Sequence, residues 1–179
     1  MNLIETYKTT NNSSDKEAYH KYISNFYSEK FSKFKNKNIN ILEIGILYGD
    51  SLKLWDDFFT DAKIYGVDIQ NRVRHQYSDK VNLIFENAYS EDFLEKIKKN
   101  NLYFDIIIED GPHTLDTQSF FLSRFSEILK KQQGSMLILE DVYPREFEIL
   151  KTKFPEFSVI DLRKEIGGEN NSVIFYKEL

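Results

Sequence analysis

Residues 39–69 read INILEIGILYGDSLKLWDDFFTDAKIYGVDI, and their pattern decides the expected fold. An apolar run of strand length ends in an acid and a glycine, a stretch with helical spacing follows, and KIYGVDI is a second apolar run. The expected buried side of the helix consists of four residues: Leu52, Trp55, Phe58 and Phe59. A strand, a helix and a second strand in this order are typical of parallel strands joined by a crossover helix.

The same alternation continues to the end of the chain. Apolar runs at 81–85, 104–110 and 136–141 alternate with helical patterns at 90–99, 115–131 and 144–154. Two final runs, 157–162 and 172–178, flank the turn-rich link GGENN at 167–171, which is typical of an antiparallel pair. The sequence therefore predicts an α/β fold: a Rossmann-like, doubly wound, seven-stranded and mostly parallel sheet with an antiparallel last strand and helices on both faces.

The N-terminal part has a helical pattern of its own. From Asp15 to about Phe34, aromatic and apolar residues recur at three- and four-residue steps, which predicts one amphipathic helix. We expect a single domain over 1–179, with a helical cap at 1–37 and a Rossmann-like core at 38–179.

Composition excludes several classes of protein. The 179 residues include no cysteine, which excludes disulfides and thiolate metal sites. A formal net charge of -5 without a dense basic tract argues against nucleic acid or an anionic membrane as the partner. No window approaches the roughly 18 apolar residues of a membrane-spanning helix, and the first residues lack the pattern of a signal peptide. We expect a cytoplasmic protein.

A glycine motif follows the first apolar run, in the spacing E-x-G-x-x-x-G. Gly45 and Gly49 would let the backbone turn and come close to a ligand, and Glu43 could accept a hydrogen bond from an ammonium group. A plain glycine turn between a strand and a helix would have the same spacing. This motif alone therefore does not decide between the two interpretations.

Asp68 ends the second run about twenty residues beyond the glycines, where an acid can bind both hydroxyls of an adenosine ribose. The chain has neither G-x-G-x-x-G nor G-x-x-x-x-G-K-[ST], the patterns built around phosphates. An acid before the glycines suits a cationic ligand without phosphate, such as S-adenosylmethionine. After the third run, Asn87 and Ala88 could contact adenine, although a turn would explain them equally well.

Two neighbouring parallel strands are expected to end in carboxylates, Glu109-Asp110 and Glu140-Asp141. Such acids meet at one edge of the sheet and repel one another unless a cation lies between them. Ligation by oxygen alone favours Mg²⁺ or a similar hard ion. We predict Asp110, Glu140 and Asp141 as metal ligands and Glu109 as a supporting residue. For any one of these acids, a helix N-cap or a lysine partner is the simpler explanation.

His113 follows Asp110 by three residues. Beside a metal it is the natural general base, because a cation stabilises an alkoxide and an imidazole with a pKa near ~6.5 can accept the proton. A histidine that starts a helix and bonds to the backbone is the alternative. Of the other two histidines, His75 is expected to be exposed, and His20 could help to line a substrate pocket.

Together these motifs resemble the class I S-adenosylmethionine-dependent methyltransferases. More narrowly, they resemble the metal-dependent sugar O-methyltransferases of macrolide and tetracenomycin tailoring, of the mycinamicin type. The resemblance lies in SSDKEAYHKYISNFY, LEIGILYGDSLKLW with IYGVDI, IIIEDGPHTLDTQ and MLILEDV. It departs from the usual Asp-Asp-Gly-Ser-His, which is Glu-Asp-Gly-Pro-His here, and from Gly-Thr-Asp-Lys, which is Ser-Ser-Asp-Lys. The resemblance implies cofactor contacts from Glu43, Gly45, Ser51 and Asp68, metal ligation by Asp110, Glu140 and Asp141, and His113 as base.

The expected activity is methyl transfer from S-adenosylmethionine to a hydroxyl of a sugar or glycosylated small molecule, with Mg²⁺ or a similar cation bound. The sequence leaves open whether the protein forms a homo-oligomer. Two other functions remain as alternatives: a catechol- or phenol-type O-methyltransferase, and a non-catalytic S-adenosylmethionine-binding module. The acidic balance and the lack of an N-P-P-[YF] motif disfavour a nucleic-acid methyltransferase.

Overall fold

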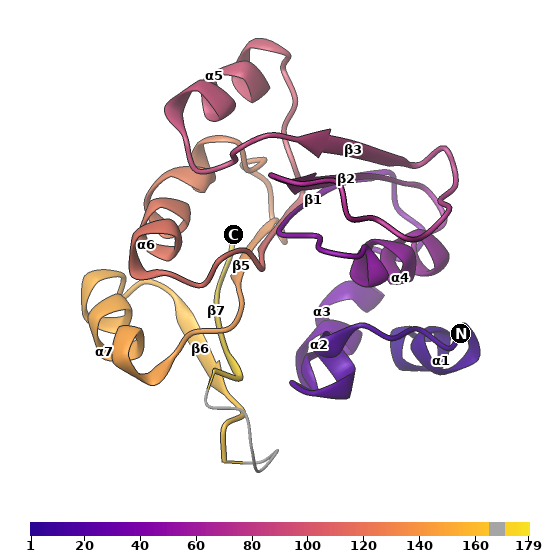
Figure 1. Ribbon diagram of the computed structural model, residues 1–179, viewed down its shortest axis with the longest axis horizontal. Coiled ribbons are helices and arrows are strands. Elements are labelled where there is room, and N and C mark those ends of the chain that lie inside the picture. Colours follow the sequence, from indigo (N-terminus) through magenta and orange to yellow (C-terminus); the bar gives the residue numbers. More distant parts are fainter. Residues whose placement is uncertain (165–170) are drawn as a thin grey trace.

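The computed structural model describes residues 1–164 and 171–179, and its centre is a seven-stranded sheet (Figure 1). The strand order is β3-β2-β1-β4-β5-β7-β6. The strands are β1 (Ile39–Ile44), β2 (Ala62–Asp68), β3 (Val81–Phe85), β4 (Ile106–Glu109), β5 (Met136–Leu139), β6 (Ser158–Asp161) and β7 (Val173–Glu178).

Parallel pairing joins β3, β2, β1, β4 and β5, whereas β7 is antiparallel to both β5 and β6. The predicted α/β sheet with an antiparallel last strand is therefore confirmed. Of the predicted link between the last two strands, residues 167–170 lie outside the described residues. The strand order reverses between β1 and β4, and in open α/β sheets ligands bind beyond the carboxyl ends of the strands at such a point.

Helices cover both faces of the sheet (Figure 1). One face is covered by α1 (Leu3–Thr9), the π-helix η1 (Ile23–Tyr27), α3 (Ser28–Ser32) and α4 (Asp50–Phe58). The other is covered by α5 (Glu91–Lys99), α6 (Leu115–Arg124), the short 3-10 helix η2 (Phe125–Glu127) and α7 (Pro144–Lys153). In the part of the chain that the structure describes, no helix is long and apolar enough to cross a membrane.

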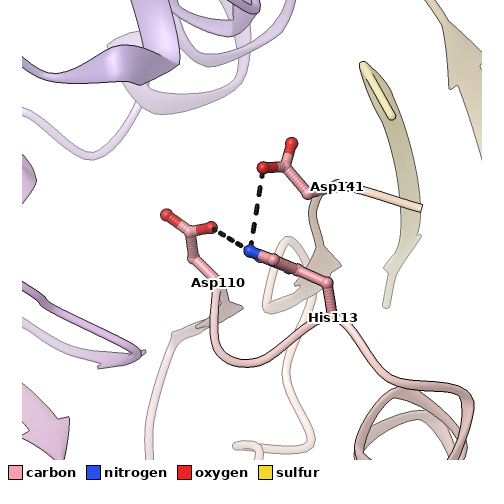
Figure 2. A group of neighbouring side chains, drawn as sticks. All are labelled: Asp110, His113 and Asp141. Carbon is pink, nitrogen blue, oxygen red and sulfur yellow. Dashed lines mark ion pairs between the residues drawn. The ribbon is translucent and has the colours of Figure 1, made fainter. Parts of the chain in front are cut away.

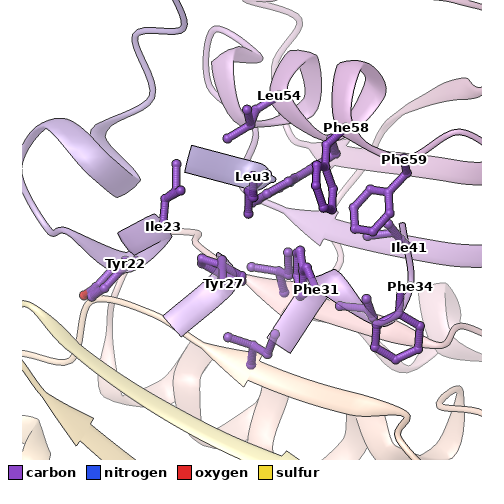
Figure 3. Close-up of a cluster of buried hydrophobic side chains, with 14 of the residues drawn as sticks. Leu3, Tyr22, Ile23, Tyr27, Phe31, Phe34, Ile41, Leu54, Phe58 and Phe59 are labelled. Carbon is purple, nitrogen blue, oxygen red and sulfur yellow. The ribbon is translucent and has the colours of Figure 1, made fainter. Parts of the chain in front are cut away.

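Aromatic side chains fill the core on the first of these faces (Figure 3). Trp55 and Phe59 of the α4 region are fully buried, and Phe31 of α3 packs edge-on against Trp55 at 5.2 Å between ring centroids. The predicted buried side of α4 is therefore confirmed. This packing holds the N-terminal helices against the sheet, next to the strand ends that carry the acids.

The predicted single helix over residues 15–34 is wrong. The first helical segment, α2 (Asp15–Ala18), ends after one turn, and Lys21 adopts a left-handed backbone with φ +58 before η1 begins. Side chains six residues apart point about 120° away from each other on an unbroken helix. The interruption lets Lys16 and Tyr22 both reach the acids at the strand ends, so tertiary contacts override the helical spacing here.

The predicted helix over residues 115–131 is too long. It ends at Arg124, and Leu129 instead forms a parallel bridge with Phe104. The amide of Phe104 donates to the carbonyl of Ile128 at 3.0 Å, and the amide of Lys130 donates to the carbonyl of Phe104 at 2.8 Å. Backbone pairing with the segment before β4 therefore replaces the last helical turns.

Candidate active site

A cavity of about 960 Å³ opens at the carboxyl ends of the central parallel strands, the size range of a small-molecule site. Its walls are the loops after β1, β2, β3 and β4, the start of α6 and residues 13–15 of the N-terminal segment. Among the described residues that line it there is no lysine or arginine. The lining acids are Asp15, Asp50, Asp68, Glu86, Asp110 and Asp116.

The glycine loop after β1 forms one side of the cavity. Gly45 has φ +82, and a Cβ there would lie 2.0 Å from the carbonyl oxygen of Asp110. The amide of Gly45 donates to Val67 of β2 at 2.8 Å, and the amide of Asp110 donates to Ile44 of β1 at 2.8 Å. The absence of a side chain at Gly45 therefore lets the loops after β1 and β4 touch.

Asp68 closes the cavity on the β2 side. Its carboxylate accepts hydrogen bonds from the amides of Ile46 and Leu47, both at 3.1 Å, and from the amide of Gln70 at 3.0 Å. These bonds fix the acid at the end of β2, next to the glycine loop. Five of the residues predicted to bind the cofactor line the cavity, namely Gly45, Ser51, Asp68, Asn87 and Ala88, whereas Glu43 and Gly49 are not among the lining residues.

Glu109, at the end of β4, is fully buried and is not among the residues that line the cavity. The hydroxyl of Tyr89, a lining residue, donates to one of its carboxylate oxygens, and the other oxygen has no hydrogen-bond partner among the described residues. Burial raises the pKa of the Glu109 carboxyl to about 7. Glu109 thus supports Tyr89 and the floor of the cavity rather than facing the open space.

Asp110, His113 and Asp141 form a compact group (Figure 2). The Nε2 atom of His113 lies 3.8 Å from an oxygen of Asp110 and 3.8 Å from an oxygen of Asp141. One potential ligand atom from each of the three lies within 4.8 Å of the others. His113 and Asp141 both have left-handed backbones, with φ +53 and +57, a strain that is frequent at functional sites.

The electrostatics of this group favour a cation. Burial raises the pKa of the Asp141 carboxyl well above its ordinary value, and the nearby Asp110 carboxylate raises it further. Burial also lowers the pKa of the His113 imidazole, more than the attraction of Asp110 raises it. The histidine is therefore neutral near pH 7, and a cation would relieve the repulsion between the two carboxylates.

Lys16, the last residue of the Ser-Ser-Asp-Lys segment, was given no role by the sequence, and the structure places it among the acids. Its side chain is only 1% exposed, and its ammonium bonds to the carboxylates of Asp110, at 2.6 Å, and Glu140. A third carboxylate, that of Glu43, lies 3.3 Å away. Burial alone lowers the pKa of Lys16, but these three acids outweigh it and hold the pKa well above its ordinary value.

Aromatic hydroxyls and one histidine complete the set of contacts from the N-terminal segment. Tyr22 donates to Asp141 at 2.7 Å, and Tyr27 donates to Glu140. His20 bonds through Nδ1 to the hydroxyl of Ser172 at 2.8 Å. Of these residues, only His20 was a candidate from the sequence, whereas Tyr22 and Tyr27 have the helical spacing of ordinary core aromatics.

The structure separates the predicted metal ligands into two sets. Asp110 and Asp141 face each other across His113, whereas Glu140 points to Lys16 and Tyr27 and lies outside the compact group. Of the remaining histidines, His20 is buried and is not among the cavity residues, and His75 is half-buried and bonds to Asp50 at 2.8 Å.

The sheet order, the cavity at the reversal point and the glycine loop together define the fold of a class I S-adenosylmethionine-dependent methyltransferase. The MycE methyltransferase of the mycinamycin pathway, solved with Mg, S-adenosylhomocysteine and mycinamycin VI, has the same fold, with a TM-score of 0.75 and 20% identity over 99% of this chain and 53% of that chain. Human methyltransferase-like protein 13, solved with S-adenosylhomocysteine, matches with a TM-score of 0.56 and 21% identity over 79% of this chain and 72% of that chain.

The curated relatives are named as O-methyltransferases, one of them of a rhamnosyl compound. Mycinamicin VI 2''-O-methyltransferase of Micromonospora griseorubida is 28% identical over 65% of this chain and 30% of its own length. Demethylmacrocin O-methyltransferase of Streptomyces fradiae is 26% identical over 65% of this chain and 31% of its own length. A rhamnosyl tetracenomycin-C 2'-O-methyltransferase of Streptomyces olivaceus is 26% identical over 72% and 35%. The chain thus spans about a third of the length of these relatives, and no protein-family model matches it.

Proposed function

We propose that this chain transfers the methyl group of S-adenosylmethionine to a hydroxyl of a sugar or glycosylated small molecule, with Mg²⁺ or a similar hard cation bound. The observation that carries the proposal is the Asp110, His113 and Asp141 group beside a cavity with a methyltransferase-type glycine loop. The rhamnosyl and olivosyl groups in the names of two curated relatives support the sugar acceptor. MycE, which has the same fold, was solved with Mg and S-adenosylhomocysteine.

The residues present fit the cofactor. Gly45 lines the cavity in the loop after β1, and Asp68 stands at the end of β2, where a ribose would lie. Glu43 is fully buried, accepts a hydrogen bond from Trp55 and lies 3.3 Å from the Lys16 ammonium, so we assign it the support of the loop. The acidic lining of the cavity is complementary to the positive charge of a sulfonium group.

The residues present also fit a hard cation. Asp110 and Asp141 offer oxygen atoms that lie close together, and both burial and the neighbouring Asp110 carboxylate raise the pKa of Asp141. A divalent cation held there would lower the pKa of an acceptor hydroxyl. We assign the cation to Asp110 and Asp141.

His113 is the proposed base. Its imidazole lines the cavity, is neutral near pH 7 because burial lowers its pKa, and can accept the proton of the acceptor hydroxyl at Nε2. The carboxylates of Asp110 and Asp141, each 3.8 Å from Nε2, stabilise the positive charge of the imidazolium that results. The walls of the cavity align the acceptor with the methyl group and exclude water, the usual contribution of a protein to such a transfer.

The lining favours a sugar over a phenol as the acceptor. Three aromatic side chains, Tyr48, Tyr89 and Phe120, line the cavity beside six acids. Carboxylates recognise several hydroxyls at once, whereas a phenol ring would need apolar planes on both sides. A non-catalytic binding module is the remaining alternative, and turnover with any acceptor separates it from the proposed enzyme.

The first prediction distinguishes a base from a ligand at position 113. With radiolabelled S-adenosylmethionine and a panel of glycosides, we expect His113→Ala to lower the rate by at least ~100-fold. Its affinity for Mn²⁺, measured by calorimetry, should stay within about threefold of the wild type if His113 is not a ligand.

Asp141→Asn is the matched variant, because it removes a proposed ligand from the same group. It should weaken both Mn²⁺ binding and turnover. If His113→Ala loses Mn²⁺ affinity as severely as Asp141→Asn, His113 is a ligand and the proposed base is wrong. Full activity of the wild type in excess EDTA would exclude the cation altogether.

A further inference from the structure

We propose that two copies of this chain pair edge to edge through β3, antiparallel and centred on Leu83, so that their two sheets form one continuous sheet. β3 is the first strand in the sheet order and lies at one edge of the sheet (Figure 1). In the part of the chain that the structure describes, β2 is the strand that pairs with it, and its other edge has no partner strand. Such pairing does not depend on the proposed methyl transfer.

Backbone groups on the free edge of β3 are the first reason. The amide of Ile64 in β2 donates to the carbonyl of Lys80 at 2.9 Å, and the parallel register continues in step to the end of β3. Along such a ladder every second residue bonds to the neighbouring strand, beginning here with Lys80. Leu83 and Phe85 therefore direct their amides and carbonyls away from β2. An edge of this kind is a template for a further strand.

The side chains on this edge are the second reason. Leu83 and Phe85 are 37% and 41% exposed, and alternation along the strand puts them on the same face as Val81, which packs against the aromatic core of the first face. The connection between β2 and β3, residues 69–80, contains no helix that would cover this face.

The sequence of the strand does nothing to protect this edge. Natural edge strands are often protected by a charge or a proline, but β3 reads Val-Asn-Leu-Ile-Phe and has neither. An apolar, uncharged edge with free backbone groups is suited to pairing with another strand.

The edge is complementary to itself, which identifies the partner as a second copy. In an antiparallel pair centred on Leu83, that residue faces Leu83 of the other copy, and Val81 faces Phe85. The apolar side chains of both copies then form one stripe. Because Leu83 directs its own amide and carbonyl outward, the two central residues can exchange both hydrogen bonds across the two-fold axis.

The charges at the ends of β3 match in the same register. Lys80, just before the strand, comes to lie opposite Glu86 of the other copy, just after it. Within one copy, Lys80 pairs with Asp56 and Glu86 pairs with Lys96. Pairing of the two edges therefore joins these ion pairs into a row of alternating charges, and opposite charges across strands stabilise a sheet.

Cysteine cross-linking tests both the pairing and its register, because the chain has no cysteine of its own. Residues in a hydrogen-bonded antiparallel pair have Cα atoms about 5.5 Å apart, within the roughly 4.4–6.8 Å of a disulfide. We expect Leu83→Cys to form a covalent dimer on mild oxidation, seen on a non-reducing gel. Phe85→Cys is the matched control, because the two copies of residue 85 would be more than about 13 Å apart.

A mixture of two variants gives a second check of the register. Tagged Val81→Cys and untagged Phe85→Cys should form a mixed covalent dimer, although neither should cross-link to itself. If Leu83→Cys gives no covalent dimer, or gives one no faster than Phe85→Cys does, the proposal is overturned.

Sedimentation velocity measures the pairing without a covalent bond. We expect the wild type to be a reversible dimer and Leu83→Lys to raise its dissociation constant at least ~10-fold, because two like charges then face each other. Circular dichroism checks that this exposed substitution leaves the fold intact. Ile149→Lys makes the same change at an exposed apolar residue of α7 and should leave the constant within about threefold. A monomeric wild type, or equal weakening by both variants, overturns the proposal.

Discussion

Single residues with unusual backbones mark the edge of the sheet where the proposed chemistry takes place. Gly45, His113 and Asp141 all have positive φ, and the three lie in the loops after β1, β4 and β5. For a non-glycine residue this conformation costs of order 1 kcal/mol or more. Contacts around His113 and Asp141 therefore stabilise a backbone that the local sequence does not favour.

Gly45→Ala tests the close approach of the two loops. A Cβ there would lie 2.0 Å from the carbonyl oxygen of Asp110, and the residue would keep its left-handed backbone only with strain. We expect a loss of about 2–4 kcal/mol in the free energy of unfolding, by the scale of overpacking and backbone strain. S-adenosylhomocysteine affinity should fall at least tenfold, measured by calorimetry on the folded fraction. Unchanged stability together with unchanged affinity would contradict this account.

At the scale of elements, the interrupted N-terminal helix is the feature with the largest consequence. The break after α2 and the π-helix η1 bring Lys16, Tyr22 and Tyr27 to the ends of β4 and β5. Such π-helical turns are frequent at functional sites. The N-terminal segment is therefore part of the site and not only a cover for the sheet.

Asp56 links α4 to the segment before β3. Its carboxylate should make the stability of the fold depend on pH. Its carboxylate accepts from the amide of Ser78 at 2.9 Å and lies 3.2 Å from the Lys80 ammonium. Burial alone would raise the pKa of Asp56, but the bonds from Ser78 and the charge of Lys80 outweigh it and lower the pKa. Because the folded pKa is below the ordinary value of 3.8, this stabilisation is present above that pH and is lost as the pH falls through the folded pKa.

We therefore expect Asp56→Asn to lower the free energy of unfolding by about 1.5–3 kcal/mol at pH 7, the range for a hydrogen bond to a charged group. The difference from the wild type should shrink as the pH is lowered below 3.8, measured by urea unfolding at a series of pH values. Asp57→Asn, one position along α4, is a suitable control, since among the described residues Asp57 pairs with Lys53 alone, at the surface. A difference that stays constant with pH would show that the charge of Asp56 is not responsible.

At the scale of the whole molecule, the charge of the cavity restricts the acceptor. Six acids and no lysine or arginine stand among its described lining residues. We expect a glycoside with a phosphate or carboxylate on the sugar to be methylated with at least tenfold lower kcat/KM than its neutral counterpart, because of like-charge repulsion. Asp116→Asn should narrow this difference, and the exposed Glu156→Gln, on the segment after α7, should not. Equal use of charged and neutral acceptors would contradict this expectation.

Local patterns were sufficient for the strands and for most of the loops that carry the site. Each of the seven apolar runs is a strand, and Gly45, Asp68 and Asp110 line the cavity at strand ends, as expected from the rule for parallel sheets. Helix ends were less predictable. The helix at α6 stops early because Leu129 pairs with Phe104, which lies 25 positions away in the chain and is invisible to a local pattern.

The sequence by itself determined the order of strands and helices, the sheet class and the placing of acids at the carboxyl ends of β4 and β5, since these depend on apolar periodicity and turn residues. Only the tertiary structure decided which acids face one another. Lys16, from a polar stretch of the N-terminal segment, is buried between three strand ends and pairs with both Asp110 and Glu140. Asp110 and Asp141 form a compact group with His113, and Glu140 is not part of that group. The physical reason is that a buried charge is stabilised by whichever opposite charges the fold brings within reach, and no spacing along the chain specifies them.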